Sequence, residues 1–218
     1  AITRRCVVAR ARRQDTQEGS HFMATWYQLA LYVHIIGVLM LFIAIGAESL
    51  VVWGIGRAQT LDEMRLWLRS TKGPEKLFPL AGALILVAGL YMTITVWQGT
   101  AWVDLGLLGL IGFSVAGSVV NGGRFKALEK ATGASGAGAL GDDVRRAVAN
   151  PTLRISLWAM SLGAVGIVYM MVVKPDWIGS IAALVISTIL GMAVGALTGR
   201  RGAAVPPPVS EDRAAARY

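Results

Sequence analysis

The sequence predicts an all-α fold, a polytopic membrane bundle of five transmembrane helices with the N-terminus outside and the C-terminus in the cytoplasm. Of its 218 residues, 55% are hydrophobic and only 16% are charged. The apolar residues form long blocks, and a block of about 18 or more apolar residues with few charges is typical of a transmembrane helix. The net charge is +8, but the basic residues flank these blocks and form no single face, which argues against nucleic-acid binding.

The predicted spans are 26–54, 77–97, 102–120, 152–173 and 177–197, within a transmembrane domain of residues 23–199. Asn150 and Pro151 have the residue types of a helix cap and a first helical position, so they open the fourth span. Residues 1–22 hold five arginines and no apolar run. We expect them to be an extension before Met23 that does not belong to the native structure. The tail, residues 200–218, is expected to be disordered.

A short helix is predicted at residues 61–70, between the first two spans. Thr60 and Glu63 have the spacing of a capping box, in which both side chains bind free backbone N–H groups at a helix start. The apolar residues of this helix share one face. The face can lie in the membrane interface or pack on the bundle's own loops, and the sequence leaves both alternatives open.

The orientation follows from the basic residues between the spans. There are five in residues 54–76, six in residues 121–154 and four in the tail, whereas the other two connections hold only Lys174. Basic connections stay in the cytoplasm, so the N-terminal end of the first span is predicted to face outward. Four tryptophans then fall at the outer membrane face as an aromatic belt: Trp26, Trp97, Trp102 and Trp177.

The fifth span carries a small residue at every fourth position. Small residues let helix backbones approach closely inside a membrane. We expect this ridge to pack within the monomer, and packing against a second copy remains the alternative. The ridge consists of Gly179, Ala183, Ser187, Gly191, Gly195 and Gly199.

Two ionisable residues lie inside the first span, His34 and Glu48. Ionisable groups are costly in hydrocarbon, so each is a candidate functional residue. They share one stripe of the helix and are about 21 Å apart along its axis at 1.5 Å per residue. They are therefore too distant to act on one another directly.

His34 is predicted at the same depth as Tyr91, Met92 and Met170 of neighbouring spans. A histidine with methionine opposite could hold a b-type haem or a copper ion. The alternative is a histidine that is hydrogen-bonded to a tyrosine, a serine or a carbonyl of a neighbouring helix. Glu48 could be a proton or cation site, or it could extend toward the interface and pair with Arg57, Arg154 or a loop lysine.

Three short segments, Leu31–Gly37, Arg65–Arg69 and Val172–Pro175, resemble a group of uncharacterised bacterial integral membrane proteins of the domain-of-unknown-function class. The first span, with its Val-His-Ile and following glycine, is more distantly similar to the copper-resistance D and HemJ-type membrane families. The HemJ resemblance implies a role for His34 as a haem ligand.

The first functional hypothesis is a non-enzymatic subunit or assembly partner in the bacterial cytoplasmic membrane. Its expected partners are the lipid bilayer and either a second copy of the chain or another protein of a membrane complex. The alternatives are a haem- or copper-linked redox protein centred on His34, and a small proton-coupled transporter that uses His34 and Glu48. The sequence has no phosphate-binding loop, no HExxH motif and no CxxC motif. Its single cysteine excludes an intrachain disulfide and a thiolate metal cluster.

Overall fold

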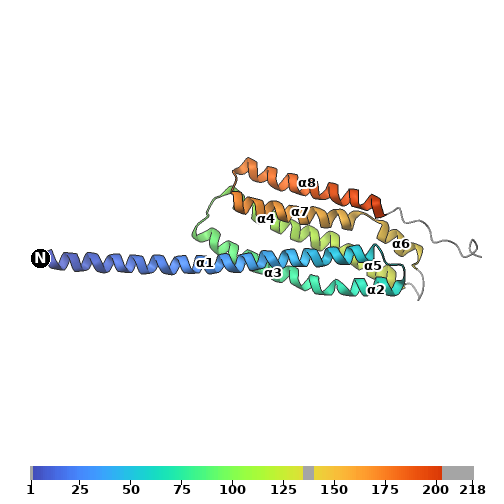
Figure 1. Cartoon of the computed structure of the whole chain (residues 1–218), viewed down its shortest axis with the longest axis horizontal. Coiled ribbons are helices and arrows are strands. Elements are labelled where there is room, and N and C mark those ends of the chain that lie inside the picture. Colours follow the sequence, from blue (N-terminus) through green and yellow to red (C-terminus); the bar gives the residue numbers. More distant parts are fainter. Residues whose placement is uncertain (1, 135–139, 203–218) are drawn as a thin grey trace, which may run out of the picture.

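The computed structural model describes the backbone of residues 2–134 and 140–202, and the side chains of residues 24–133 and 140–198. This part of the chain is helical and has no strand (Figure 1). The elements, in chain order, are α1 (Ile2–Ile55), α2 (Leu61–Ser70), α3 (Lys72–Thr95), α4 (Ala101–Ala116), the π-helical turn η1 (Gly117–Asn121), α5 (Gly122–Ala134), α6 (Asp142–Ala149), α7 (Thr152–Val173) and α8 (Trp177–Gly202).

Five helical segments are long and apolar enough to cross a membrane: Ala24–Ile55, Leu61–Thr95, Ala101–Gly133, Asp142–Val173 and Trp177–Thr198. The prediction of an all-α, multi-pass bundle is therefore confirmed. The bounds of α2 and α7 agree with the predicted ones, whereas α3 begins at Lys72 rather than at residue 77. The third span does not end at residue 120, because α4 continues through η1 into α5.

The described residues at both ends of the chain are helical. α1 begins at Ile2, so the arginine-rich segment continues the first span as a helix that projects beyond the bundle (Figure 1). Residues 200–202 complete α8 and are helical rather than disordered. The rest of the tail, residues 203–218, lies outside the described residues.

The closest helix pairs are α1 with α3 and α7 with α8. In α8, a Cβ atom added to Gly195 would lie 2.7 Å from the Cα of Ile155, and one added to Gly191 would lie 2.6 Å from the Cα of Ala159. The reverse arrangement occurs at Gly166 of α7, where an added Cβ would meet the side chain of Ser187. This part of the ridge packs within the monomer, as the sequence favours.

Ala183 also faces α7, because a Cβ added to Gly166 would lie 3.2 Å from the Ala183 carbonyl oxygen, whereas the two end residues of the ridge differ. Gly179 contacts Pro175 and Asp176 of its own preceding turn, not α7. The surroundings of Gly199 are outside the described side chains.

A small apolar core lies at one end of the bundle, where α2, α5 and α6 gather around the end of α1 (Figure 1). We call this assembly the cap. Its buried residues are Val51, Ile55, Leu61, Met64, Leu68, Leu128 and Val144. The buried residues of α2 therefore pack on the protein itself.

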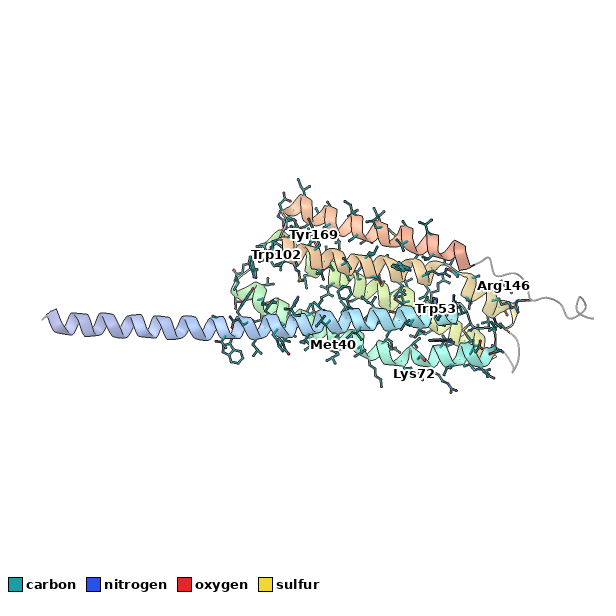
Figure 2. All side chains as sticks on the ribbon, in the orientation of Figure 1. Met40, Trp53, Lys72, Trp102, Arg146 and Tyr169 are labelled. Carbon is teal, nitrogen blue, oxygen red and sulfur yellow. The ribbon has the colours of Figure 1, made fainter. Side chains whose placement is uncertain are left out.

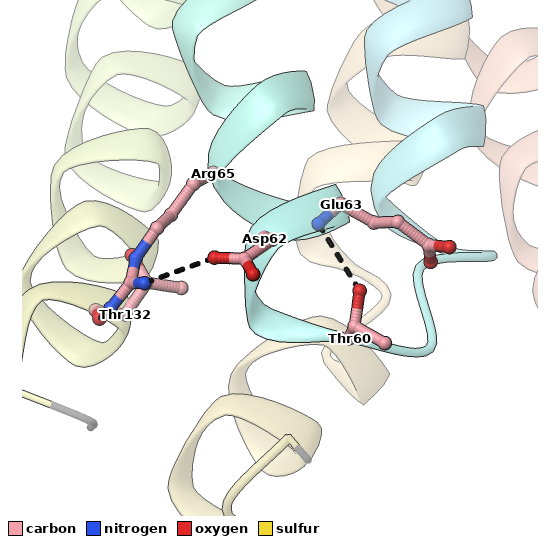
Figure 3. Close-up of polar contacts among 5 residues, drawn as sticks. All are labelled: Thr60, Asp62, Glu63, Arg65 and Thr132. Carbon is pink, nitrogen blue, oxygen red and sulfur yellow. Dashed lines mark hydrogen bonds and ion pairs between the residues drawn. The ribbon is translucent and has the colours of Figure 1, made fainter. Parts of the chain in front are cut away.

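The capping box of α2 forms as predicted, with a small shift of one partner. The Thr60 hydroxyl accepts from the backbone N–H of Glu63 at 3.3 Å, and the Glu63 carboxylate accepts from that of Gln59 at 2.8 Å. Arg65 donates to the Asp62 carboxylate and to the Thr132 carbonyl, each at 3.3 Å. These bonds fix the start of α2 and join it to α5 (Figure 3).

Aromatic residues and one lysine join the connections at the other end of the bundle. The indole N–H of Trp97 donates to the Tyr27 hydroxyl at 3.0 Å, and the rings of Trp97 and Trp102 meet edge to face at 5.3 Å. Lys174, the left-handed residue that ends α7, holds its ammonium 3.9 Å from the Trp97 ring centre. Trp102 and Trp53 lie toward opposite ends of the bundle (Figure 2).

Candidate functional site

His34 is buried where α1 and α3 are in close contact, with 7% of its surface exposed. Its Nδ1 lies 3.1 Å from the carbonyl oxygen of Ile85. The ring rests against Gly89, where an added Cβ would be 3.3 Å from both Cε1 and Nδ1. The hydrogen bond is the predicted alternative of a histidine bonded to a carbonyl of a neighbouring helix.

The second ring nitrogen of His34, Nε2, is the atom on which the chemistry of this site depends. A carbonyl only accepts hydrogen bonds, so Nδ1 carries a proton and the neutral ring has its lone pair on Nε2. Nε2 is buried and has no hydrogen-bond partner among the residues that the structure describes. A bond from Nδ1–H to a backbone carbonyl is the arrangement that commonly orients an imidazole as a metal ligand.

The methionines predicted near His34 are both buried. Met92 lies three residues beyond Gly89 on the buried face of α3, and Met170 of α7 is completely enclosed. Tyr91, by contrast, is 38% exposed. Among the described side chains, no group of three His, Cys, Asp or Glu residues could hold a metal ion.

The spacing of α1 and α3 restricts what could bind beside His34. One turn further along α1, a Cβ added to Gly37 would lie 3.0 Å from the backbone nitrogen of Ile85. Helices in such close contact would have to repack to admit a flat haem between them. A single ion held by imidazole nitrogen and thioether sulfur needs no such slot.

Glu48 is buried on the same helix, with 9% of its surface exposed. The side-chain amide of Asn121 donates to its Oε1 at 3.2 Å and lies 3.9 Å from the sulfur of Met160. Asn121 Oδ1 is buried and has no partner in the described part of the chain. Glu48 and Asn121 thus form a polar pair inside the bundle.

The predicted arginine partners of Glu48 lie elsewhere. Arg57 stacks over the Trp53 ring at 4.2 Å, and Arg154 donates to the Thr198 carbonyl at 3.1 Å. Among the described side chains, the carboxylate of Glu48 forms no ion pair. The predicted pairing of Glu48 with an arginine is therefore wrong, and the alternative of a proton or cation site stays a prediction.

Asn121 is a candidate site residue that the sequence analysis does not identify. The third span is predicted to end at Val120, so Asn121 falls just outside this span. It occupies the last position of η1 and is 4% exposed. Such π-helical turns are rare and occur frequently at functional sites. The sequence pattern that could have identified Asn121 is an amide residue directly after an apolar run, beside Gly122 and Gly123.

The fold and these polar positions define the class: this is a multi-pass helical membrane protein with two separate polar sites inside its bundle, His34 and the Glu48–Asn121 pair. No protein-family model, no curated protein and no solved structure matches the chain. The resemblance to uncharacterised bacterial membrane proteins therefore remains an expectation from the sequence.

Proposed function

We propose that the protein is a proton- or cation-coupled membrane transporter, or a transport subunit, with the Glu48–Asn121 pair as its ion site. The observation that carries this proposal is a buried carboxyl bonded to an amide that a π-helical turn presents. Such intramembrane carboxyls mark proton and ion pathways in transport proteins.

The chemistry of the amide supports a role in proton exchange. Its NH₂ group donates to a carboxylate, and its oxygen accepts from a protonated carboxyl after the amide turns over. Asn121 can therefore bond Glu48 in either protonation state. The same two oxygens, of the carboxyl and the amide, also suit a small hard cation.

The proposal places the protein in the bacterial cytoplasmic membrane, with the cap on the cytoplasmic side. This orientation is supported by the basic residues, which gather in the connections that build the cap. It also puts the Tyr27–Trp97 end outside, where a pocket of about 290 Å³ lies between α1 and α3. That pocket is lined by Ala24, Tyr27, Gln28, Tyr91, Thr95 and Val96.

Replacing Glu48 with glutamine is expected to reduce ion flux at least about tenfold, because glutamine keeps the shape and a hydrogen bond but cannot exchange a proton. The measurement is proton or sodium flux into proteoliposomes under an imposed membrane potential, against protein-free vesicles. Glu129→Gln, which removes an exposed carboxyl of α5, is the matched control and should retain wild-type flux.

An independent measurement is the pH-dependent infrared difference spectrum, in which the Glu48 carboxyl band should vanish in Glu48→Gln. Wild-type flux equal to that of empty vesicles, together with no such band, would refute the ion site. In that case the remaining hypothesis is the membrane subunit or assembly partner, with or without a homo-oligomer.

Metal ligation at His34 is the second candidate, because its Nε2 is buried without a partner while Nδ1 is fixed to the Ile85 carbonyl. Under this hypothesis, purified protein binds copper(I), and His34→Gln abolishes the binding; a haem Soret band is not expected, because haem would require α1 and α3 to repack. Met92→Leu separates copper ligation by a His–Met pair from ligation by His34 alone. A wild-type preparation that does not bind added copper(I) eliminates the candidate.

A further inference from the structure

A further polar feature lies one helical turn beyond the Glu48–Asn121 pair, between the ends of the spans and the cap. It is a partly enclosed cavity of about 40 Å³. Val52, one turn after Glu48, and Arg124, one turn after Asn121, both line it. The other lining residues are Ile55, Gly56, Ala127, Leu128, Ala147, Val148, Asn150, Leu153 and Arg154.

Two arginines from different helices meet at this cavity. Arg124 comes from α5 and Arg154 from α7, and both are only partly exposed. Arg124 donates to the Thr152 hydroxyl at 3.4 Å, and Arg154 donates to the Thr198 carbonyl at 3.1 Å. Both acceptors are neutral, so neither bond offsets the charge of a guanidinium group.

The positive charge at the cavity is not balanced by nearby carboxylates. Within the described side chains, the ion pairs are Arg65–Asp62 and Arg146–Asp143, and neither includes a cavity arginine. Two partly desolvated guanidinium groups without a counterion favour an anion, and their forked N–H groups match the oxygens of a phosphate. The volume corresponds to roughly three ordered waters, which one oxyanion could replace.

The level of the cavity in the fold indicates where the phosphate comes from. Its walls come from α5, α6, the first turn of α7 and the end of α1, where the membrane-crossing segment Ala24–Ile55 ends. Phospholipid phosphates lie at this level of a bilayer, and basic pockets between helices on the cytoplasmic side bind anionic headgroups. A lipid phosphate therefore reaches the cavity without leaving the membrane.

We propose that the cavity between Arg124 and Arg154 binds a phosphate group, supplied by the headgroup of an anionic phospholipid. The bound phosphate bridges α5 and α7 and so holds the cap against the membrane-crossing helices. This site is independent of ion binding at Glu48, because it uses other side chains and a separate cavity.

The experiment measures the melting temperature of the full-length protein in neutral detergent, followed by tryptophan fluorescence. The added probes are phosphatidylglycerol, phosphatidylcholine and inorganic phosphate. Phosphatidylglycerol should raise the melting temperature progressively, because a ligand that binds only the folded state stabilises it. In Arg124→Gln/Arg154→Gln, the lipid concentration needed for half of this shift should rise by at least about tenfold.

Two further variants separate the effect of the cavity from the effect of net charge. Arg69→Gln/Lys126→Gln removes the same charge from exposed positions of α2 and α5, outside the cavity, and should respond to lipid as the wild type does. Ala127→Phe keeps both arginines but fills the cavity from an exposed position, and should also abolish the shift. The melting transition of each variant without lipid verifies that it is folded.

The outcomes separate the sources of the phosphate. A shift with phosphatidylglycerol that inorganic phosphate does not reproduce supports the headgroup. An equal, saturable shift with inorganic phosphate supports the phosphate site and overturns its assignment to lipid. No shift with any probe, or an equal loss in Arg69→Gln/Lys126→Gln, overturns the proposal.

Discussion

Gly191→Leu is expected to lower the free energy of unfolding by about 3 kcal/mol, because an overpacked interface has no room for the new side chain. A Cβ at this position already meets the carbonyl of Trp158 and lies 2.6 Å from the Cα of Ala159. These are backbone atoms, so no rotamer change removes the overlap. α7 and α8 must move apart, and close backbone approach is what stabilises helix pairs in a membrane.

The measurement for this variant is reversible unfolding in mixed micelles. Gly112→Leu is the matched control, since an added Cβ at Gly112 has no neighbour within 4 Å. The control should be as stable as the wild type or slightly more so, because leucine favours a helix more than glycine does. Equal stability of Gly191→Leu and Gly112→Leu would contradict the α7–α8 packing.

Asn121→Leu is expected to destabilise the protein by about 3 kcal/mol, because it leaves the Glu48 carboxyl buried without its hydrogen-bond donor. Glu48→Leu should also destabilise, since it removes the acceptor from the Asn121 amide. When both residues become leucine, neither position leaves a buried polar side chain without its partner. The double variant should therefore regain most of the lost stability.

The double-mutant cycle of these three variants gives the interaction energy of the pair. Ser118→Leu, at an exposed position of the same π-helical turn, measures the effect of leucine on η1 itself and should be nearly neutral. Additive effects of Asn121→Leu and Glu48→Leu would show that the two side chains do not interact. Ion flux measured with the same variants distinguishes a loss of transport from a loss of stability.

Local patterns in the sequence were sufficient to locate the five membrane-crossing helices, but not the start of the second or the end of the third. Burial in lipid requires long apolar helices, so hydropathy fixes where a span lies. The predicted fourth span, 152–173, coincides with α7, and the predicted short helix, 61–70, coincides with α2. The capping box of Thr60 and Glu63 was also predictable, because it joins residues within one turn.

The sequence also identified His34 and Glu48 as the ionisable residues of the first span, and both are buried. It did not identify their partners. The Ile85 carbonyl is 51 residues from His34 along the chain, and the Asn121 amide is 73 residues from Glu48. Hydropathy and spacing describe neighbours along the chain, whereas these contacts depend on how helices pack side by side.

What the sequence by itself determined is the class of the protein, the positions of its spans and the two residues that are costly to bury. Only the tertiary structure decided that α2 belongs to a cap, that η1 directs Asn121 to Glu48, and that Arg124 and Arg154 share one cavity. The physical reason is that hydrophobic length is a property of each segment alone. A polar site depends on the rotation and register of several helices, which their close packing fixes.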